Sequence, residues 1–297
     1  MFKAGFVAIL GRPNVGKSTL LNTILGMKIT AVSPWPQTTR KRQFGILNLD
    51  EAQIIFVDTP GIHNPLHKLG EHMNREAVKV LDECDIALAI VDISQPPTDE
   101  DRILFEHLSS KKKAIPLLIV ENKIDLVDHN ALDTNHTAFL SLLSNVEAKS
   151  VSATRGDNLQ ELIAWIIAKL PTNPPFFPEE QVTDLLEREI AADLIRESVL
   201  YHLRAEVPHS IAIRIDEYKE RDPKSIFIAA TLFVERESQK GIVIGQGGEM
   251  LKGIGIAARQ EIEALTGRKV FLQLRVKVRK NWRNDESALQ LFGFGKD

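Results

Sequence analysis

The sequence of 297 residues contains a single cysteine, Cys84, and its formal net charge is only −3 at pH 7. One cysteine excludes a disulfide within the chain, which fits a reducing compartment. Cys84 lies where a helix is expected to end, so we expect it to be buried and structural. A net charge near zero does not distinguish between ligand classes, so only local charge can point to nucleic acid.

Long apolar runs are also missing. No run approaches the roughly 18 apolar residues that a membrane-spanning helix needs. The apolar segment 5–10 continues directly into a glycine-rich loop in place of a small-residue cleavage site, so we expect no signal peptide. The sequence therefore predicts a cytoplasmic chain, long enough for two domains that each bury a core.

A phosphate-binding loop is the first motif along the chain. The apolar run 6–10 is followed by Gly11-Arg12-Pro13-Asn14-Val15-Gly16-Lys17-Ser18, which fits the pattern G-x-x-x-x-G-K-[ST]. A helix that opens at Ser18-Thr19 would place backbone N–H groups and its positive end around a polyphosphate. Lys17 can then reach the β- and γ-phosphates, and the Ser18 hydroxyl can ligate Mg²⁺. The strand before the loop and the helix after it argue against a plain glycine turn.

A second motif, Asn122-Lys123-Ile124-Asp125, follows the apolar run 115–120. Asp125 can accept hydrogen bonds from the N1–H and the N2 amine of guanine, which adenine does not present in that arrangement. A site of this kind rejects the analogue that lacks the bonded group by roughly 10⁴–10⁵. We expect Asn122 to brace the loop and touch the base, and the Lys123 stem to cover the ring. After a phosphate loop, this motif predicts guanine specificity.

Two further segments complete the predicted nucleotide site. The buried-strand run 54–57 ends in Asp58-Thr59-Pro60-Gly61. Asp58 can hold Mg²⁺ through water, and the Gly61 N–H can sense a γ-phosphate. The second segment is Ser152-Ala153-Thr154, where the Ala153 N–H can point at the guanine O6.

In this order and spacing the motifs resemble the translation-factor-related GTPases over about residues 1–170. The resemblance implies that the first switch segment is Gln37-Thr38-Thr39-Arg40. Thr39, or as the weaker candidate Thr38, would then join Mg²⁺ when GTP is bound. The expected catalytic residues are Lys17, Thr39, Asp58 and Gly61.

Ile62 stands where Ras-like GTPases carry a glutamine that orients the attacking water. Because isoleucine cannot orient water by hydrogen bonding, we expect slow unassisted hydrolysis, near or below about 10⁻⁴–10⁻³ s⁻¹. The resemblance to related bacterial GTPases implies that Asn14 could help to hold K⁺ beside the phosphates. The alternative is that Asn14 only hydrogen-bonds its own loop, and the sequence leaves both open.

Strand-like runs near 5–10, 54–57, 86–91, 115–120 and 148–151 alternate with helix-periodic segments. This alternation predicts an α/β domain over 1–170, with a mostly parallel sheet and flanking helices. The expected helix 157–170 has one apolar stripe, formed by Leu159, Leu162, Ile163, Ile166 and Leu170. Four prolines within 171–178 predict a stiff, extended linker over 171–180.

Residues 181–297 predict an α+β domain. A helix over 183–204 is expected to start at Thr183 and to be buried through Leu186, Ile190, Leu194 and Val199. Strands 211–217 and 226–235 follow, with the inward residues Ile211, Ile213, Ile215, Ile226, Ile228, Ala230 and Leu232. After a glycine-rich turn come a helix over 249–265 and a strand over 269–279. With a short helix before the turn, the order is α-β-β-α-α-β.

The turn is Gly245-Gln246-Gly247-Gly248, which matches the G-x-x-G turn that clamps about four nucleotides in KH domains. Alone it could be an ordinary helix-to-helix turn. Its place among the predicted elements resembles the prokaryotic, type II KH arrangement and favours RNA binding. Gln246 and Gly247 supply no charge there, so phosphate attraction must come from elsewhere.

The closing strand is a candidate source of that charge. Even-numbered residues from 270 to 278 are apolar and should face the core, while Gln273, Arg275, Lys277 and Arg279 share the other face. Residues 268–283 include seven basic residues and no acidic one, which favours a phosphate track. Trp282 could stack on a base or, as the better alternative, cap the core.

Taken together, a guanine-specific GTPase domain, a proline-rich linker and a KH-like domain resemble the Era family across essentially the whole chain. The resemblance implies a GTPase of small-ribosomal-subunit (30S) assembly that binds near the 3′ end of 16S ribosomal RNA and contacts the inner membrane peripherally. We expect a monomer. A small-molecule kinase would leave the guanine-recognition motifs without a role. A membrane-associated GTP switch whose second domain binds a protein partner is the alternative.

Overall fold

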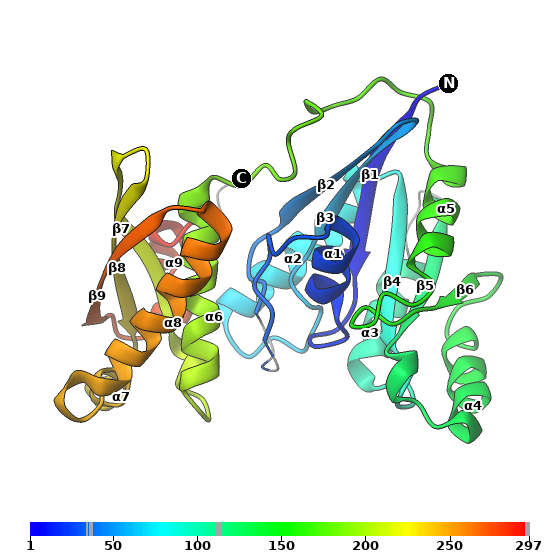
Figure 1. The fold of residues 1–297 in the computed structure, drawn as a ribbon. Helices are drawn as coiled ribbons and strands as arrows, with labels where there is room; N and C mark the ends of the chain where they lie inside the picture. Colours follow the sequence, from blue (N-terminus) through cyan, green and yellow to red (C-terminus); the bar gives the residue numbers. More distant parts are fainter. Residues whose placement is uncertain (34, 36–37, 111–114, 295–297) are drawn as a thin grey trace. The chain divides into compact units, whose positions relative to one another are not determined.

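The computed structural model of the protein describes residues 1–33, 35, 38–110 and 115–294 (Figure 1). The chain divides into two compact units. The first comprises Met1–Ile29, Thr39–Pro65 and Met73–Asp184, and the second comprises Thr30–Thr38, Leu66–His72 and Leu185–Asp297. Among the described residues, no helix has both the length and the apolar character needed to cross a bilayer.

A six-stranded sheet forms the centre of the first unit, in the order β2-β3-β1-β4-β5-β6. Its strands are β1 Lys3–Leu10, β2 Gln43–Leu49, β3 Ala52–Asp58, β4 Ile86–Asp92, β5 Leu117–Asn122 and β6 Glu147–Ser150. Every neighbouring pair is parallel except β2 and β3, which are antiparallel. The five predicted strands are confirmed. The sequence analysis missed β2, an edge strand in which Gly45 and Asn48 interrupt the apolar run.

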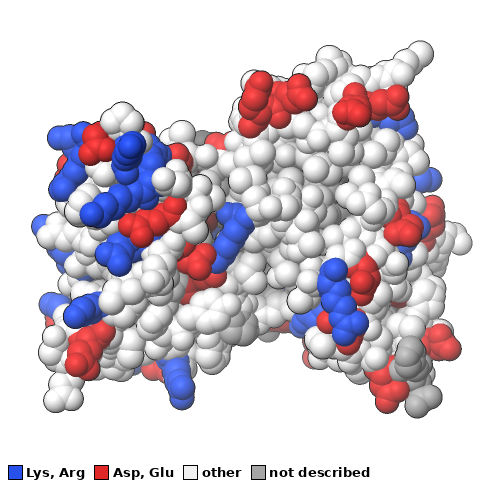
Figure 2. Space-filling view, viewed as in Figure 1, with Lys and Arg blue, Asp and Glu red and all other residues white. Residues whose placement is uncertain are grey.

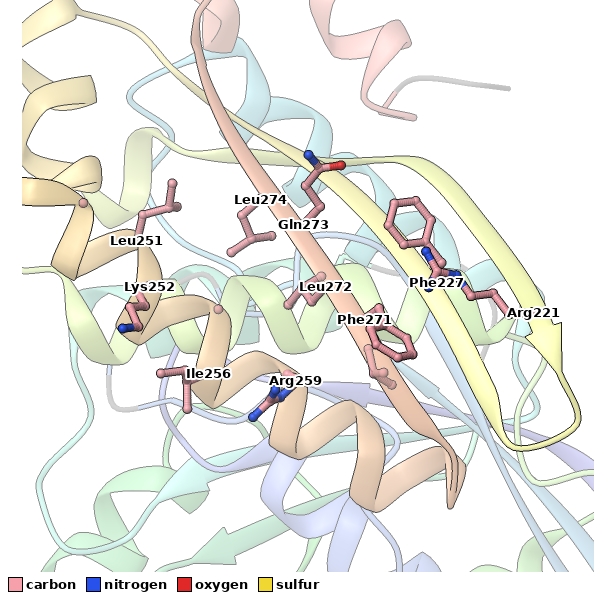
Figure 3. Close-up of a pocket in the computed structure, with 13 residues that line it drawn as sticks. Arg221, Phe227, Leu251, Lys252, Ile256, Arg259, Phe271, Leu272, Gln273 and Leu274 are labelled. Carbon is pink, nitrogen blue, oxygen red and sulfur yellow. The ribbon is translucent and has the colours of Figure 1, made fainter.

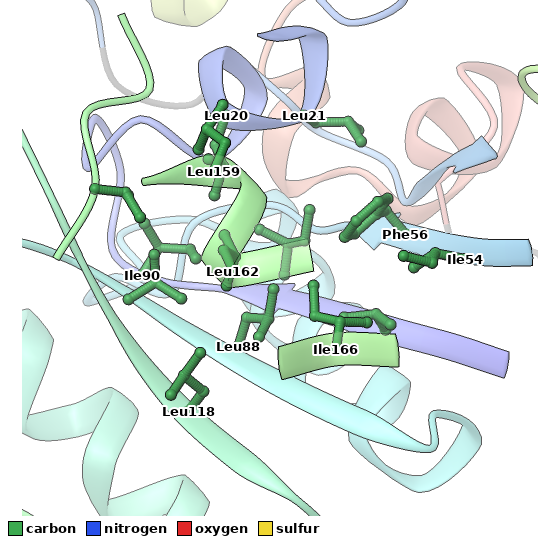
Figure 4. Packing of buried hydrophobic residues seen from close by; sticks show 14 of the residues in the cluster. Leu20, Leu21, Ile54, Phe56, Leu88, Ile90, Leu118, Leu159, Leu162 and Ile166 are labelled. Atoms are coloured by element: carbon green, nitrogen blue, oxygen red, sulfur yellow. The ribbon is translucent and has the colours of Figure 1, made fainter. Parts of the chain in front are cut away.

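In the described part of the chain, the helices around this sheet are α1 Lys17–Leu25, α2 Lys68–Glu83, α3 Asp99–Ser109, α4 His129–Leu140 and α5 Leu159–Lys169. Helices α1 and α5 pack on one face, where Leu20, Leu162 and Ile166 meet Leu88 and Ile90 (Figure 4). Helices α2, α3 and α4 cover the other face. The predicted stripe of α5 faces the core, and Cys84 is buried just after α2, as expected.

The parallel sheet fixes where the motifs lie. The loops that follow β1, β3, β5 and β6 all leave the carboxyl ends of parallel strands, and these ends share one edge of the sheet. Ligands of open α/β sheets bind at this edge. The four predicted nucleotide motifs therefore come together although they span about 140 positions of sequence.

The proline-rich segment predicted as a linker packs on the first unit. The Ala4 N–H donates to the Pro171 carbonyl at 3.2 Å. Gln53 holds the segment from both sides, because its Oε1 accepts from the Phe176 N–H at 2.7 Å and its Nε2 donates to the Phe177 carbonyl at 2.8 Å. The Phe176 ring also lies 5.1 Å from that of Phe6. The segment bends at residues 176–177 and turns at 179–180, and these contacts anchor it to the first unit.

The second unit contains α6 Glu187–His202, β7 Ala212–Asp222, β8 Ser225–Val234, α7 Glu237–Ile244, α8 Glu249–Thr266, β9 Lys269–Val278 and α9 Glu286–Leu291. The sheet order is β7-β8-β9, with β7 and β8 antiparallel and β8 and β9 parallel. Up to β9 this is the predicted α-β-β-α-α-β order. Helices α6 and α8 cover one face of the sheet through Ile190, Leu194, Ile254, Ala258 and Ile262.

Two predictions for this unit were wrong in detail. The first helix begins at Glu187, and Leu186 precedes it and is 63% exposed. The Leu186 N–H donates to the Glu189 carboxylate at 3.1 Å. Thr183 bridges to Gly45 and does not start the helix. The inward residues of β8 are buried as predicted, and on β7 the half-buried Ile213 packs against the same core as the buried Ile211 and Ile215.

Trp282 caps the core and is not a stacking surface. Its side chain is fully buried, and its indole N–H donates to the Ser210 carbonyl at 2.7 Å. The ring of Phe292, just after α9, packs edge-on against it at 5.2 Å. The sequence analysis did not identify α9.

Candidate functional site

The phosphate loop connects β1 to α1. The Lys17 ammonium donates to the carbonyls of Gly11 and Arg12, each at 3.0 Å, so it lies inside the loop. Burial lowers the pKa of Lys17 to about 8, even though the negative charge of Asp58 acts to raise it. Oxygens of a polyphosphate would supply the negative charge that this buried ammonium lacks.

Three side chains converge beside Lys17. The Ser18 hydroxyl donates to Asp58 Oδ2 at 3.0 Å, the Thr39 hydroxyl donates to the same oxygen at 3.2 Å, and the two hydroxyls lie 3.0 Å apart. Burial raises the pKa of Asp58, against the lowering effect of Lys17 and of both hydroxyls. Asp58 Oδ1 is buried, and no hydrogen bond from the described part of the chain reaches it.

These groups fit Mg²⁺. Hydroxyl and carboxylate oxygens are the ligands that this hard cation prefers, and it usually keeps several of its waters. Asp58 Oδ1 could accept from such a water, and the cation would offset the cost of the buried carboxylate. The Thr38 hydroxyl instead bonds Ser33 Oγ at 3.0 Å and the Trp35 carbonyl at 2.9 Å. The geometry therefore favours Thr39 over Thr38.

The loop after β3 lies directly against the phosphate loop. A Cβ placed on Gly61 would lie 2.6 Å from the Pro13 nitrogen, and the Ile62 N–H donates to the Gly11 carbonyl at 3.2 Å. Only glycine permits this approach. The Ile62 side chain is buried in the core cluster on the α2 face, so it neither reaches nor orients a water in the site.

Asn122 connects the phosphate loop to the loop after β6. Its amide Nδ2 donates to the Val15 carbonyl at 2.8 Å, and its Oδ1 accepts from the Ala153 N–H at 2.9 Å. The bracing role predicted for Asn122 is visible in this geometry. The same bond means that the Ala153 N–H, predicted to face the guanine O6, points at Asn122 here.

Asp125 is held by the segment after β6. The Ser152 hydroxyl donates to Asp125 Oδ1 at 2.7 Å and in turn accepts from the Arg155 N–H at 3.1 Å. Asp125 is only half-buried, and its other oxygen is available to a base. The sequence indicated that Ser152 and Asp125 belong to one site, and the structure brings them into contact.

Asp92, at the end of β4, is a residue that the sequence analysis missed. Its Oδ2 accepts from the Lys123 ammonium at 2.7 Å and lies 3.9 Å from the Arg12 guanidinium. Burial acts to raise the pKa of Asp92, but hydrogen bonds from Lys123 and Ser94 outweigh it and the pKa is lowered. Asp92 therefore ties the guanine motif to the phosphate loop. Its place after a buried strand, like that of Asp58, was the available signal.

The remaining predicted nucleotide residues occupy varied positions. Asn14 is exposed on the loop, with a left-handed φ of 63°. The Thr59 hydroxyl donates to the Ile9 carbonyl at 2.8 Å and faces the sheet. Gln37 lies outside the described residues. The others are Val15 and Gly16 in the phosphate loop, Thr19 on α1, Pro60 beside Gly61, and Thr154, which is exposed after Ala153.

In the second unit the G-x-x-G turn joins α7 to α8. The φ angles of Gly245, Gly247 and Gly248 are 74°, 59° and 83°, in the left-handed region that favours glycine. A Cβ on Gly245 would lie 2.6 Å from Met250 Cβ, whereas Gly247 and Gly248 face open space. The turn therefore has one packed glycine and two whose backbone a ligand can approach.

A groove of about 630 Å³ begins at this turn and runs between α8 and β9 (Figure 3). It is lined by Arg221, Phe227, Gly248, Leu251, Lys252, Gly255, Ile256, Arg259 and residues 270–274. Lys252, Arg259 and Arg221 supply positive charge, and Leu251, Ile256 and Leu274 supply apolar surface. Sequence reasoning found Gly248 and missed Lys252 and Arg259, which lie on one face of α8 at a seven-residue spacing.

The basic face of β9 is less uniform than its sequence predicts. Arg275 and Lys277 are exposed but do not line the groove. Arg279 pairs with Asp285 at 3.3 Å, and Arg283 pairs with Glu235 at 2.6 Å. Figure 2 shows basic side chains of the second unit interspersed with acidic ones. Carboxylates from outside the segment, one nearby in sequence and one distant, thus pair with a segment that has none of its own.

Comparisons with known proteins identify a family for each of the two units. Residues 6–123 match a family described as 50S ribosome-binding GTPase, and residues 206–283 match the KH domain family. The chain is 45% identical to GTPase Era of Carboxydothermus hydrogenoformans over 294 residues, which cover 99% of this chain and 98% of that protein.

Two solved structures are similar over almost the whole chain. One is Era in complex with MgGDPNP and nucleotides 1506–1542 of 16S ribosomal RNA, with a TM-score of 0.94, 40% identity and 99% of each chain covered. The other is an Aquifex aeolicus Era variant bound to GDP and AlF4⁻, with a TM-score of 0.93, 40% identity, and 98% of this chain and 99% of that chain covered.

Proposed function

Because the chain belongs to the Era family of GTPases, we propose that it couples GTP hydrolysis to binding of 16S ribosomal RNA near its 3′ end during assembly of the 30S subunit. The single observation that carries the RNA part is the groove between α8 and β9, which opens at the G-x-x-G turn. A similar chain has been solved with MgGDPNP and nucleotides 1506–1542 of that RNA, which supports the choice of ligand.

In the nucleotide site, the carboxylate of Asp125 reads the guanine edge while Asn122 holds the two flanking loops together. Asp92 fixes the Lys123 ammonium, so that the Lys123 stem can lie along the base. The Ala153 N–H turns from Asn122 to the guanine O6, or is shared between them, when the base is bound. These contacts select guanine over adenine.

In the phosphate site, Lys17 and the backbone N–H groups of the loop bind the β- and γ-phosphates. Mg²⁺, held by Ser18 and Thr39 and through water by Asp58, neutralises charge that develops on the phosphates. The Gly61 N–H contacts the γ-phosphate, since Gly61 already lies against Pro13. Ile62 does not replace the missing glutamine, because its side chain faces the core.

Equilibrium binding tests the proposed function. A labelled RNA with the sequence of the 16S 3′ segment should bind the full-length protein, and its affinity should differ between the GTP-analogue and GDP states. A scrambled RNA of equal length is the control. Equal affinity for both RNAs in both states would contradict the proposal.

The second cofactor in this proposal is K⁺, with Asn14 as a ligand. Replacing Na⁺ by K⁺ at fixed ionic strength should raise GTP turnover by about tenfold or more, a small part of the 10³–10⁵ that an arginine finger supplies. Asn14→Ala should abolish the gain with nucleotide affinity largely kept. Asn14→Gly is the matched control for backbone strain. Glycine also lacks the amide, but it keeps the left-handed backbone without strain, so it should lose the gain as Asn14→Ala does. Equal rates in the two salts would leave an external activator to compensate for Ile62.

Peripheral contact with the inner membrane stays a prediction from the family resemblance, and cytoplasmic location and a monomeric state stay predictions from the sequence. The alternative is a membrane-associated switch whose second unit binds a protein partner. The basic face of β9 supports the membrane part of this alternative, because basic surfaces also bind anionic lipid. The acidic partners of Arg279 and Arg283 weaken that argument.

A further inference from the structure

The groove of the second unit continues beyond the α8–β9 channel to a stack of three side chains. The guanidinium carbon of Arg221 lies 4.9 Å from the ring centroid of Phe227 and 4.8 Å from that of Phe271. The Lys269 ammonium lies 5.4 Å from the Phe271 centroid. Arg221, Phe227 and Phe271 all line the same groove as Gly248. We call these three residues the aromatic stack.

The aromatic stack lies at the end of the sheet where strands β8 and β9 begin. Phe227 and Phe271 are register neighbours on these two strands, and Arg221 comes from the end of β7. Figure 3 shows the stack on the opposite side of β9 from Lys252, Ile256 and Arg259. A strand of RNA that leaves the channel across β9 therefore meets the stack next.

Phe271 is not required by the core. Its neighbours Val270 and Leu272 face the apolar cluster under the helices, whereas Phe271 faces outward and is 41% exposed. Arg221 holds the ring by a cation–π contact. An exposed aromatic ring fixed in this way offers a preformed surface on which a base can stack.

Two cations lie beside the ring of Phe271, those of Arg221 and Lys269. Within the described ranges, neither Arg221 nor Lys269 forms an ion pair, although the adjacent Arg268 pairs with Glu187 and Glu220. Arg221 and Lys269 are thus able to bind a phosphate beside the ring. Aromatic rings combined with unpaired basic side chains are typical of single-stranded nucleic-acid sites.

We propose that the aromatic stack is an additional RNA subsite, where a nucleobase stacks on Phe271 and a flanking phosphate binds Arg221 or Lys269. It holds a nucleotide beyond the roughly four that a G-x-x-G groove clamps. The occupant is the same RNA strand, because the stack is continuous with the groove. This inference rests on the proposed function, since it requires RNA in the groove.

A length series of RNA tests the subsite. Full-length protein in the GTP-analogue state is titrated with labelled RNAs that extend a four-nucleotide core one residue at a time from either end. Wild type should gain affinity at one particular extension, by roughly 5- to 100-fold. Phe271→Leu should lose that gain and leave the affinity for the core RNA unchanged. Phe271→Tyr, which keeps the ring, should retain the gain.

Arg221→Gln is the second variant, and it should reduce the gain and its salt dependence. Equal loss for short and long RNAs in Phe271→Leu, or no gain on extension in wild type, would overturn the subsite while the proposed function stands. If wild type binds RNA of no length, the proposed function itself fails. Thermal unfolding of each variant shows whether the fold is retained.

Discussion

Asp125→Asn is expected to convert the nucleotide site from guanine to xanthine preference. GTP affinity should fall by about 10²–10⁴-fold, since each hydrogen bond to a charged group contributes about 1.5–3 kcal/mol and two are lost. In the structure the Ser152 hydroxyl donates to Asp125 Oδ1. The asparagine Oδ1 can keep that bond, which turns its amide N–H toward the 2-oxo group of xanthine.

Competition between GTP and xanthosine triphosphate for a fluorescent nucleotide measures this shift. Asp133→Asn, an exposed position on α4, is the matched control and should leave the GTP preference unchanged. If Asp125→Asn also retains the wild-type preference, the base is read elsewhere and the role of Asp125 is wrong.

Replacing Gly247 and Gly248 together by aspartate should sharply reduce RNA affinity. Aspartate tolerates the left-handed region, and both positions face open space, so the fold should survive. The carboxylates would block close approach of the RNA backbone and repel its phosphates. Asparagine at both positions is the matched control. It has the same size as aspartate but no charge, so it separates the steric block from the repulsion of the phosphates. GDP affinity checks that the first unit is intact.

Arg275→Ala with Lys277→Ala should act differently. Neither residue lines the groove, so the loss of affinity should be smaller and the same for every RNA sequence. The slope of log affinity against log salt should flatten by about 0.7 per lost phosphate contact. If neither double substitution changes RNA affinity, the groove is not an RNA site and the protein-binding alternative takes the lead.

The nucleotide site was largely predictable because its chemistry is written in short, contiguous segments. Phosphate binding depends on glycines and a lysine at fixed spacing, and the parallel sheet then brings the segments to one edge. Asp92 was missed for a physical reason. Its place after a buried strand is only a weak signal, and its importance depends on Lys123 and Arg12, which reach it only in the folded chain.

The second unit shows where sequence reasoning fails. Alternation predicted the inward side of β9 correctly, since that pattern is local. The charge of the basic segment was overestimated, because Glu235 comes from a distant part of the chain and Asp285 lies just beyond the segment's end. The aromatic stack was invisible for the same reason, as Arg221, Phe227 and Phe271 belong to three different strands. The fold follows from local sequence patterns, whereas the chemistry of a surface depends on which distant residues the folded chain brings together.

Sequencing of RNA crosslinked to the full-length protein most directly tests the central claim, that the groove between α8 and β9 binds single-stranded 16S ribosomal RNA near its 3′ end. Crosslinking is carried out in cells and repeated with Gly247→Asp/Gly248→Asp. The account predicts reads concentrated at the 3′ end of 16S ribosomal RNA in wild type, with crosslinked residues in α8 and β9, and loss of these reads in the variant. Reads spread evenly over cellular RNA, or unchanged in the variant, would contradict it.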